Sequence, residues 1–418
     1  MRTFVVGIGM SKFEKPGEMD YTIYATEALK EAVEDWKLPV EEIKAVFASY
    51  VYGESCCGQR AFNEFARTGV PVVNVNNNCS SGSTALYLAN NHVKATGQPA
   101  LALGFEVMEK GLGGRYLEWP QPIAPYLAAL YDIFPDGIPV NPRIQSGSSA
   151  TLLMFEAVAQ EHKQKYGTKL DTFVKIAHKN HVHGAHNKKA AYPKELTMEE
   201  ITNPKRNLTE HIYTAMASPT SNGGAAAIIV SEDYLKAHPH LIPNAIEIVG
   251  QSLTTDKGTD FGTTVSKTMG FEIAKEGAQQ ALNQAKKNIK DVDFIELHDC
   301  FAPNELATYE ALGLCPVGDG AKFVDSIRWE QRSEGGKQAV MGNRWVINPS
   351  GGLESKGHPL GATGLGQCYE ICSQLRNRVE PQRQVPSPKV ALQHNLGIGS
   401  ACVITVYEKP QNLQGNKL

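Results

Sequence analysis

The stretch PVVNVNNNCSSGSTALYLANNHVKATGQPALALGFEVM, residues 71–108, contains a complete strand–helix–strand unit. An apolar run stands at each end, and Ala85, Leu86, Ala89 and Val93 recur between them at the spacing of one helix face. A strand that is joined through a helix to a second strand is typical of a parallel sheet, because the helix returns the chain across one face of the sheet. The stretch therefore predicts an α/β fold.

The same alternation continues on both sides of this unit. Upstream, the apolar runs TFVVGIGM and AVFASYVYG enclose a helical pattern between Ala25 and Trp36. From about residue 245 the order recurs, since AIEIVGQSL, DVDFIELHDC and RWVINPSGG are strand-like and helical patterns cover Ala274–Ala285 and Ala362–Leu375. KVALQHN and ACVITVYEK, joined by LGIGS, predict a terminal hairpin. We therefore expect two similar halves.

Residues 111–210 differ in composition from both halves and predict an inserted loop domain. The segment includes the run HKNHVHGAHNKKAAYPKE, which we expect to form a solvated basic surface or to screen a phosphorylated ligand. The apolar GGAAAIIVSED that follows predicts a strand returning to the first sheet. We expect residues 1–110 with 211–240 to form the N-terminal half, and residues 241–418 to form the C-terminal half.

The composition of the 418 residues, 42% hydrophobic and 20% charged, is that of an ordinary soluble protein. A formal net charge of −3 gives no reason to expect nucleic acid or an anionic membrane as the main partner. The sequence has no apolar run of the roughly 18 residues that a membrane span needs, and its N-terminus lacks the apolar stretch of a signal peptide. Eight cysteines without a CxxC pair indicate reduced thiols in a cytosol-like compartment.

Four loops hold the residues considered for chemistry, because loops at the carboxyl ends of parallel strands line the sites of such folds. Two halves packed face to face would bring these loops together. The loops are NNNCSSGS with Cys79, HDCFAPNE with His298 and Cys300, KGHPLGAT with His358, and HNLGIGSA with Gly397 and Gly399.

Cys79 stands where a strand becomes a helix, so the helix dipole and free backbone N–H groups favour its thiolate and indicate a nucleophile. The alternative is a small buried cysteine at a strand end. His358 occupies the matching turn of the second half, where it could take the thiol proton or simply cap the turn.

Cys300 would be a second thiol in the same site, and two thiols with two histidines are hard to explain by packing alone. One cysteine would hold an acyl group while the other moves a proton at carbon. A zinc site is the competing interpretation. The spacing argues against it, because His298-x-Cys300 lacks a nearby partner pair, and His181, His183 and His186 lie in a polar segment without cysteines. We expect no metal.

These loops together resemble the thiolase superfamily, and HDCF resembles the thiolase part of the peroxisomal sterol carrier protein X family. Matching stretches include VVGIGMSKF, VNVNNNC, ALGFE, NELATYEALGLCPVG, WVINPSGGLESKGHPLGATG and VALQHNLGIG, and the resemblance runs from about residue 3 to 408. It implies a thiolase fold, with two similar βαβαβαββ halves packed as a layered α/β structure that carries an inserted loop domain. The sterol carrier domain that often follows is expected to be absent.

The resemblance also implies a role for each candidate residue. Cys79 would take the acyl group, His358 would activate Cys79, and Cys300 would protonate the acetyl-CoA carbanion that leaves a 3-oxoacyl-CoA. His298 and His358 would hold the thioester oxygen, and the N–H groups of Cys79 and Gly399 would form the oxyanion hole for acyl transfer. The products would be acetyl-CoA or propionyl-CoA and a shortened acyl-CoA, from a straight, 2-methyl-branched or sterol side-chain substrate.

Three positions depart from the family pattern. Asn222 lies in PTSNGG where PTSDGA is usual, Glu156 replaces the usual glycine after MF, and Ser400 replaces a second glycine after Gly399. Residues 112–150 also match the family poorly. Because this lobe should shape the acyl pocket, the reaction class is better defined than the substrate.

Three alternatives stay open. The same site can run toward carbon–carbon bond formation, as in acetoacetyl-CoA synthesis. A non-catalytic thiolase-fold protein could bind acyl-CoA, although it would have no need for two thiols. Steroid aldolases of the superfamily resemble a thiolase that has lost its nucleophilic cysteine, which the presence of Cys79 argues against.

The expected partners are CoA and acyl-CoA substrates and, by the resemblance, a second copy in a homodimer. No cofactor beyond the substrate CoA is expected, because acyl transfer and enolate protonation include no redox step. The polar end QNLQGNKL is either a bare tail or an address, since Asn416-Lys417-Leu418 keeps the basic and leucine positions of the peroxisomal SKL signal. We expect a peroxisome-type organelle, with a cytoplasmic or mitochondrial location as the alternative.

Overall fold

The computed structural model describes residues 1–108, 124–134, 150–261 and 263–410, and within these residues the strands form a 12-stranded sheet. Its order is β3-β2-β4-β5-β1-β6-β12-β11-β7-β10-β9-β8. The strands of the first half are β1 (Thr3–Met10), β2 (Ala45–Ser49), β3 (Val72–Val75), β4 (Ala100–Glu106) and β5 (Gly223–Ser231). Those of the second half are β6 (Ile246–Thr254), β7 (Phe294–Glu296), β8 (Arg328–Gln331), β9 (Lys337–Met341), β10 (Trp345–Ile347), β11 (Val390–Gly397) and β12 (Ala401–Glu408).

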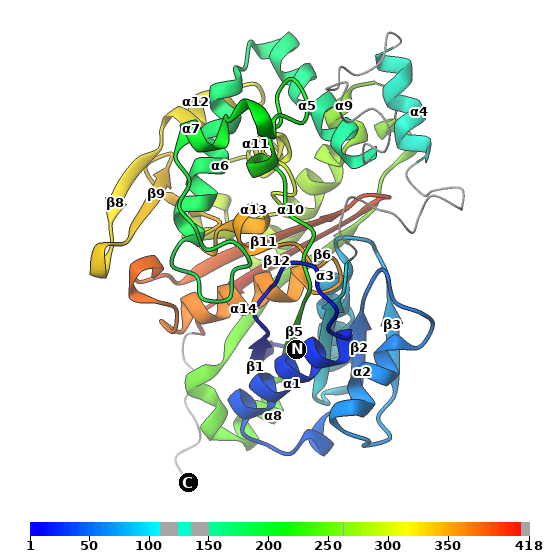
Figure 1. Cartoon of the computed structure of the whole chain (residues 1–418). Coiled ribbons are helices and arrows are strands. Elements are labelled where there is room, and N and C mark those ends of the chain that lie inside the picture. Colours follow the sequence, from blue (N-terminus) through cyan, green and yellow to red (C-terminus); the bar gives the residue numbers. More distant parts are fainter. Residues whose placement is uncertain (109–123, 135–149, 262, 411–418) are drawn as a thin grey trace.

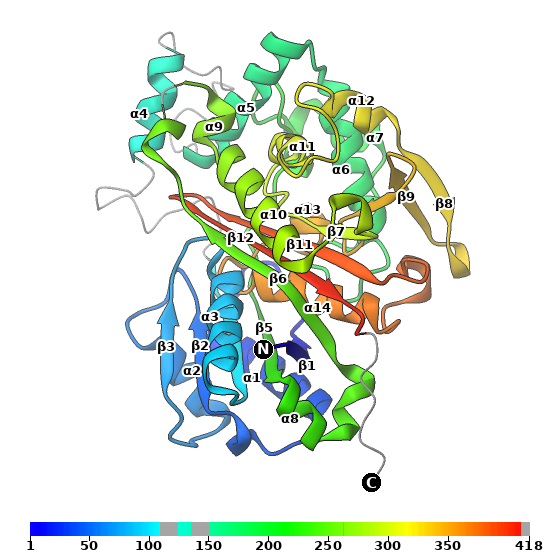
Figure 2. The ribbon, with the colours of Figure 1, turned by 180° about the vertical axis from the view of Figure 1, so that it is seen from behind.

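Helices cover both halves and also fill the space between them (Figures 1 and 2). On the outer faces, α1 (Tyr21–Trp36) and α2 (Cys57–Phe65) pack on the first half, and α10 (Phe271–Ala285) and α11 (Ala302–Ala311) pack on the second. α3 (Ser81–Thr96) and α14 (Thr363–Leu375) share one core with strands of both halves. The predicted layered α/β fold of two similar halves is confirmed, and β11 and β12 form the predicted hairpin.

The two halves seat their first outer helix in the same way. Gly9 of β1 faces the backbone of Ala28 in α1, and Gly250 of β6 faces the backbone of Ala281 in α10. A Cβ at either glycine would collide with the carbonyl oxygen of its partner. Glycine at these two positions therefore allows each helix to lie directly on its strand, as the repeated βα pattern predicts.

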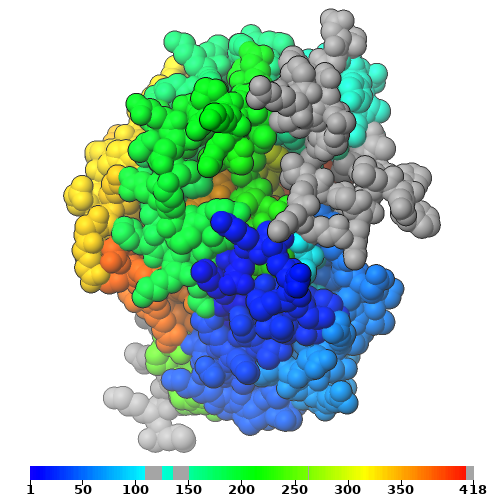
Figure 3. Space-filling view, viewed as in Figure 1, coloured from blue at the N-terminus to red at the C-terminus, as the bar shows by residue number. Residues whose placement is uncertain are grey.

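The segment predicted as a loop domain contributes helices that lie above the sheet in Figure 1. They are α4 (Ala124–Ile133), α5 (Ala150–Tyr166), α6 (Leu170–Gly184) and α7 (Met198–Ile201). Buried side chains of these helices join the same core as α10 and α11, and Figure 3 shows this green upper part packed on the blue N-terminal half. Most of residues 112–150 lie outside the described residues, and the division into domains stays a prediction.

The prediction that the histidine-rich run forms a solvated surface is wrong for α6. Lys179, His181 and His183 are buried, because α6 packs against α11 and α13 (Gly352–Lys356). His181 Nε2 bonds to the carbonyl of Ala215 (3.0 Å) and His183 Nδ1 to the carbonyl of Ile347 (3.1 Å). Burial lowers the pKa of His181 to about 4 and that of His183 to about 3, so both rings are neutral.

Lys179 is the cation of a buried cluster that contains three carboxyl groups. Its ammonium group pairs with Glu305, and both side chains are 0% exposed. Asn180 Nδ2 lies 2.7 Å from Glu305 Oε2 and 3.1 Å from both Asp299 Oδ2 and Glu354 Oε2. Burial and then the charge of Glu305 raise the pKa of Asp299 to about 8. The cluster therefore holds at least one proton at neutral pH.

Replacing Lys179 with methionine is expected to lower the free energy of unfolding by about 3–5 kcal/mol, because buried carboxylates lose their cation. Lys322→Met is a matched control, since Lys322 is 82% exposed and its pair with Asp319 (2.7 Å) lies in solvent. Loss of that pair is expected to cost at most about 1 kcal/mol. Urea unfolding followed by circular dichroism measures both variants. Equal losses would contradict a stabilising role for the buried pair.

Candidate active site

Cys79 lies in the loop between β3 and α3, two residues before the helix begins. Asn78, with a φ of 53°, turns the chain toward the helix. Burial raises the pKa of the Cys79 thiol to about 12, although nearby backbone N–H groups act in the opposite direction. Desolvation outweighs these N–H groups, so the resting site favours the protonated thiol and not the predicted thiolate.

His358 lies between α13 and α14, and its hydrogen bonds determine which ring nitrogen carries the proton. The Thr363 hydroxyl donates to the carbonyl of Pro359 (2.9 Å), so Thr363 Oγ1 accepts the proton of His358 Nδ1 (2.7 Å). The lone pair of the ring is then on Nε2, which bonds to no other group among the described residues. Burial lowers the pKa of His358 to about 3, which keeps the ring neutral and its Nε2 lone pair unprotonated at neutral pH.

The structure brings the candidate thiols and histidines of the two halves together. Cys79 Sγ and one ring nitrogen each of His298 and His358 lie within 4.8 Å of one another. The two imidazole rings meet edge to face, with centroids 5.0 Å apart. Cys300 follows in the same loop as His298 and is buried. Burial, and then the proximity of Cys79, raise the pKa of Cys300 well above its usual range, so this thiol carries a proton.

The fourth loop contacts the nucleophile loop across 320 positions of sequence, where Asn78 Nδ2 donates to the Ile398 carbonyl (2.9 Å). Gly397 packs against the same loop, since a Cβ there would collide with the carbonyl of Asn77. Gly399, with a φ of 100°, is exposed in the turn between β11 and β12. Its predicted N–H role in an oxyanion hole stays a prediction.

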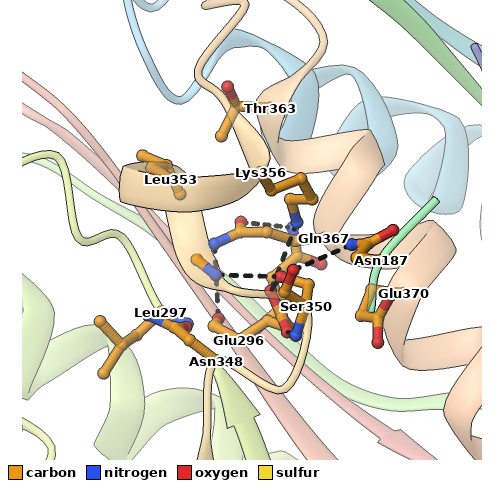
Figure 4. A network of polar contacts seen from close by, with 12 residues as sticks. Asn187, Glu296, Leu297, Asn348, Ser350, Leu353, Lys356, Thr363, Gln367 and Glu370 are labelled. Atoms are coloured by element: carbon orange, nitrogen blue, oxygen red, sulfur yellow. Dashed lines mark hydrogen bonds and ion pairs between the residues drawn. The ribbon is translucent and has the colours of Figure 1, made fainter. Parts of the chain in front are cut away.

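A buried network around Glu296 fixes the loop that leads to His358 (Figure 4). Glu296 accepts the N–H (3.0 Å) and the hydroxyl (2.7 Å) of Ser350 and lies 3.4 Å from the ammonium group of Lys356. Asn187 Nδ2 donates to the Ser350 carbonyl (2.9 Å). Because Glu296 also ends β7, which leads into the HDCF loop, one network positions both histidine-bearing loops.

Two buried carboxyl groups that position site loops were not predicted as site residues. Asp299, between His298 and Cys300, accepts the N–H groups of Leu353 (2.8 Å) and Glu354 (3.2 Å) in α13.

Glu106, at the end of β4, accepts three backbone N–H groups and has its pKa raised to about 7 by burial. The sequence signal for Glu106 was an acid at the end of an apolar strand, which needs dedicated hydrogen-bond donors. The donors to Glu106 are Val51, Tyr52 and Gly361.

The structure shows the contacts of two departures from the family pattern. Asn222 Oδ1 accepts the N–H of Met108 (2.8 Å), next to the strand end that carries Glu106, a bond that an aspartate could also make. Ser400 has a φ of 80°, which is unfavourable for a residue with a Cβ. Its hydroxyl oxygen accepts the N–H of Asp256 (2.6 Å), and this bond offsets part of the conformational cost.

Two groups among the described residues have the spacing of metal ligands. One is the Cys79, His298 and His358 cluster, and the other is Glu156, Glu210 and His211. Glu156, the third departure, is buried and accepts a bond from His211 Nδ1 (2.8 Å), while Glu210 pairs with a lysine. The histidines of the run considered for zinc, His181, His183 and His186, belong to neither group.

A buried thiol beside a neutral imidazole base, with a second protonated thiol at the junction of two similar α/β halves, defines an acyl-transfer enzyme. Family models describe the same architecture, since the model for the thiolase N-terminal domain matches residues 3–114 and that for the thiolase C-terminal domain matches residues 261–409. The chain belongs to the thiolase family. Enzymes of this family are acyltransferases that use CoA as a substrate and need no other cofactor.

Relatives and solved structures show the same likeness over almost the whole chain. It is 44% identical to sterol carrier protein 2 of Rattus norvegicus over 413 residues, 97% of this chain and 72% of that protein. It is 41% identical to non-specific lipid-transfer protein-like 2 of Caenorhabditis elegans, over 97% of this chain and 96% of that one. Human mitochondrial 3-ketoacyl-CoA thiolase in complex with CoA shares the fold, with a TM-score of 0.66 and 18% identity over 97% of this chain and 98% of that one. Among the described residues, every helix is too short or too polar to cross a bilayer.

Proposed function

We propose that this protein cleaves 3-oxoacyl-CoA with CoA, through an acyl group carried on Cys79. The observation that supports this most directly is the approach of Cys79 Sγ to the two imidazoles, with all three atoms within 4.8 Å of one another. A thiol whose pKa is raised to about 12 becomes a nucleophile only if a base removes its proton during attack, and the free Nε2 of His358 is such a base.

The proposed reaction has two halves. His358 takes the proton of Cys79, and Sγ attacks the 3-oxo carbon. The bond between C2 and C3 then breaks, its electron pair becomes the enolate of acetyl-CoA or propionyl-CoA, and Cys300 supplies the proton at C2. In the second half the Cys300 thiolate takes the proton of the CoA thiol, and the CoA sulfur attacks the acyl group on Cys79. The Cys79 sulfur leaves, recovers its proton from protonated His358, and the shortened acyl-CoA is released. No oxidant or metal takes part in these steps.

Condensation is the same chemistry in the opposite direction, so the ratio of the two rates in one preparation measures the preferred direction. For the acyl group we propose straight, 2-methyl-branched and sterol side-chain 3-oxoacyl esters. The identity of 41–44% to proteins named for sterol carriage and lipid transfer supports a lipid acyl group.

A panel of straight and branched 3-oxoacyl-CoA esters tests the function. We expect thiolysis of at least one ester, and an acetyl adduct on Cys79 detected by mass spectrometry after incubation with acetoacetyl-CoA. Treatment with EDTA is expected to leave the rate unchanged. Binding of acyl-CoA without an adduct or turnover would favour the non-catalytic alternative, whereas a loss of activity in EDTA would favour a metal at the site cluster.

We also propose that the protein forms a homodimer through the edge strand β3. Among the described residues this strand ends the sheet at the N-terminal side, and Val73 on it is 47% exposed. An edge strand with an exposed apolar side chain is a template for pairing with a second chain. Sedimentation of wild type and Val73→Lys tests the proposal, since the charge should shift the population toward monomer.

Location in a peroxisome-type organelle is a proposal that depends on Asn416-Lys417-Leu418 and on the likeness to sterol carrier proteins. The tail lies outside the described residues. A fluorescent protein that carries QNLQGNKL at its C-terminus is expected to become punctate in cells with marked peroxisomes. Uniform fluorescence would show that these eight residues are not an address and would favour the cytoplasmic alternative.

A further inference from the structure

A chain of hydrogen bonds that ends on His298 starts at a backbone carbonyl. Gln393 Nε2 donates to the carbonyl of Gly364 (2.6 Å) and to Ser83 Oγ (2.8 Å), and Gln393 Oε1 accepts the hydroxyl of Tyr407 (2.6 Å). A carbonyl oxygen can only accept, so the side-chain amide of Gln393 has one consistent orientation. Gln393 and Ser83 are both 0% exposed.

The direction of the first bond determines those that follow. Ser83 Oγ accepts from Gln393, and its own proton is donated to Asn395 Oδ1 (2.8 Å), which fixes the orientation of the Asn395 amide. Asn395 then presents its Nδ2 to His298 Nδ1 at 3.0 Å. An imidazole nitrogen that accepts a hydrogen bond carries no proton, and the neutral ring of His298 must therefore carry its proton on Nε2.

The surroundings favour this single arrangement. A Cβ at Gly364 would overlap Ser83 Oγ and lie 2.5 Å from Asn395 Oδ1, so the last glycine of GHPLGATG leaves the space that these bonds occupy. Asn395 is 0% exposed, and water does not compete for its amide. Burial lowers the pKa of His298 well below its usual range and keeps the ring neutral. The tautomer of a neutral ring determines which nitrogen can donate a hydrogen bond.

We propose that Ser83 and Asn395 are positioning residues that hold His298 in the Nε2–H form, so that it donates a hydrogen bond to the substrate thioester oxygen. The inference rests on the function proposed above. His358 is held in the opposite form, with the proton on Nδ1 facing Thr363 and a free lone pair on Nε2. Two histidines whose rings are 5.0 Å apart therefore have different tasks, one as donor and one as base.

The tautomer can be measured without substrate. In protein labelled with ¹⁵N-histidine, the signals of His298 are assigned by their loss in His298→Gln. We expect a protonated Nε2 and an unprotonated Nδ1 in wild type. In Asn395→Asp the carboxylate is expected to accept a hydrogen bond from the His298 ring, so the ring proton moves to Nδ1. Ser83→Ala is expected to give a mixture of the two His298 tautomers. Asn90→Asp is the matched control, since Asn90 is also 0% exposed but bonds to Thr3 and Gln251.

Activity provides an independent reading. Loss of one donor to a developing oxyanion is expected to lower kcat of Asn395→Asp by about a hundredfold or more, with little change in KM. A carboxylate beside His298 raises the pKa of the ring, and the imidazolium that forms at low pH again carries a proton on Nε2. The deficit of Asn395→Asp relative to wild type should therefore shrink as the pH falls. A role in folding alone would produce no such recovery.

Three results would overturn the proposal: a wild-type His298 with its proton on Nδ1, an unchanged tautomer in Asn395→Asp, or an equal loss of activity in Asn90→Asp. If Asn395→Asp does not fold, the wild-type tautomer and the Ser83→Ala mixture decide the question. A wild-type protein with the Nε2–H tautomer but without thiolysis would disprove the proposed function and leave the positioning role intact.

Discussion

Replacing Cys79 with alanine is expected to lower thiolysis at least about a thousandfold, a loss of some 4 kcal/mol of barrier reduction. The thiol is the group placed beside both imidazoles, and its removal leaves His358 without a nucleophile to activate. The side chain is small, so the fold should survive with a thermal midpoint near that of wild type. Steady-state thiolysis of acetoacetyl-CoA measures the effect.

Cys372→Ala is the matched control for this variant. Cys372 is also buried, on α14, and does not belong to the cluster of Cys79, His298 and His358. We expect its thiolysis rate to stay within a factor of a few of wild type. If Cys79→Ala keeps more than about one part in a thousand of the wild-type rate, Cys79 is not the nucleophile.

Replacing Cys300 with alanine is expected to separate the two halves of the reaction. The mutant should still accept an acyl group on Cys79 from a donor thioester, because His358 and Cys79 are unchanged. It should fail to exchange the α-protons of acetyl-CoA with deuterated water, with a loss of about a hundredfold or more, since general acid–base catalysis contributes about 10²–10⁴. Mass spectrometry of the protein and of the recovered acetyl-CoA measures both steps.

Cys315→Ala provides the comparison for Cys300, because Cys315 is a half-buried free thiol just beyond the end of α11. Normal exchange in Cys300→Ala would assign the proton transfer at carbon to another group. Loss of both acylation and exchange would instead indicate that Cys300 supports the geometry of the nucleophile loop.

The fold was predictable because its pattern is local and repeated. Apolar runs and helical spacing in residues 3–108 and 246–408 correspond to β1–β4, α1, α3, β6, α10 and the terminal hairpin. The strand at DVDFIELHDC is shorter than predicted, since β7 ends at Glu296 and the residues that follow turn into the site. Periodicity locates an element, but side-chain chemistry at its end determines where it stops.

The site was predictable only in part. Motifs located Cys79, His298, Cys300 and His358, and the structure brings the two cysteines and the two histidines together. The basic composition of the run predicted an exposed Lys179, and this was wrong. A lysine is usually exposed, but here it is buried with an acidic partner, Glu305. Such pairing across 126 positions leaves no signal in a single sequence.

The bond between Asn78 and Ile398 has a consequence for the growing polypeptide. At roughly 5–20 residues per second, the ribosome adds the turn that meets Asn78 about 16–64 s after the nucleophile loop, since 320 positions separate the two. His298 and His358 are also added late, so the cluster that they form with Cys79 assembles only when synthesis of the chain is nearly complete. The activity proposed above is therefore acquired only with the last part of the polypeptide.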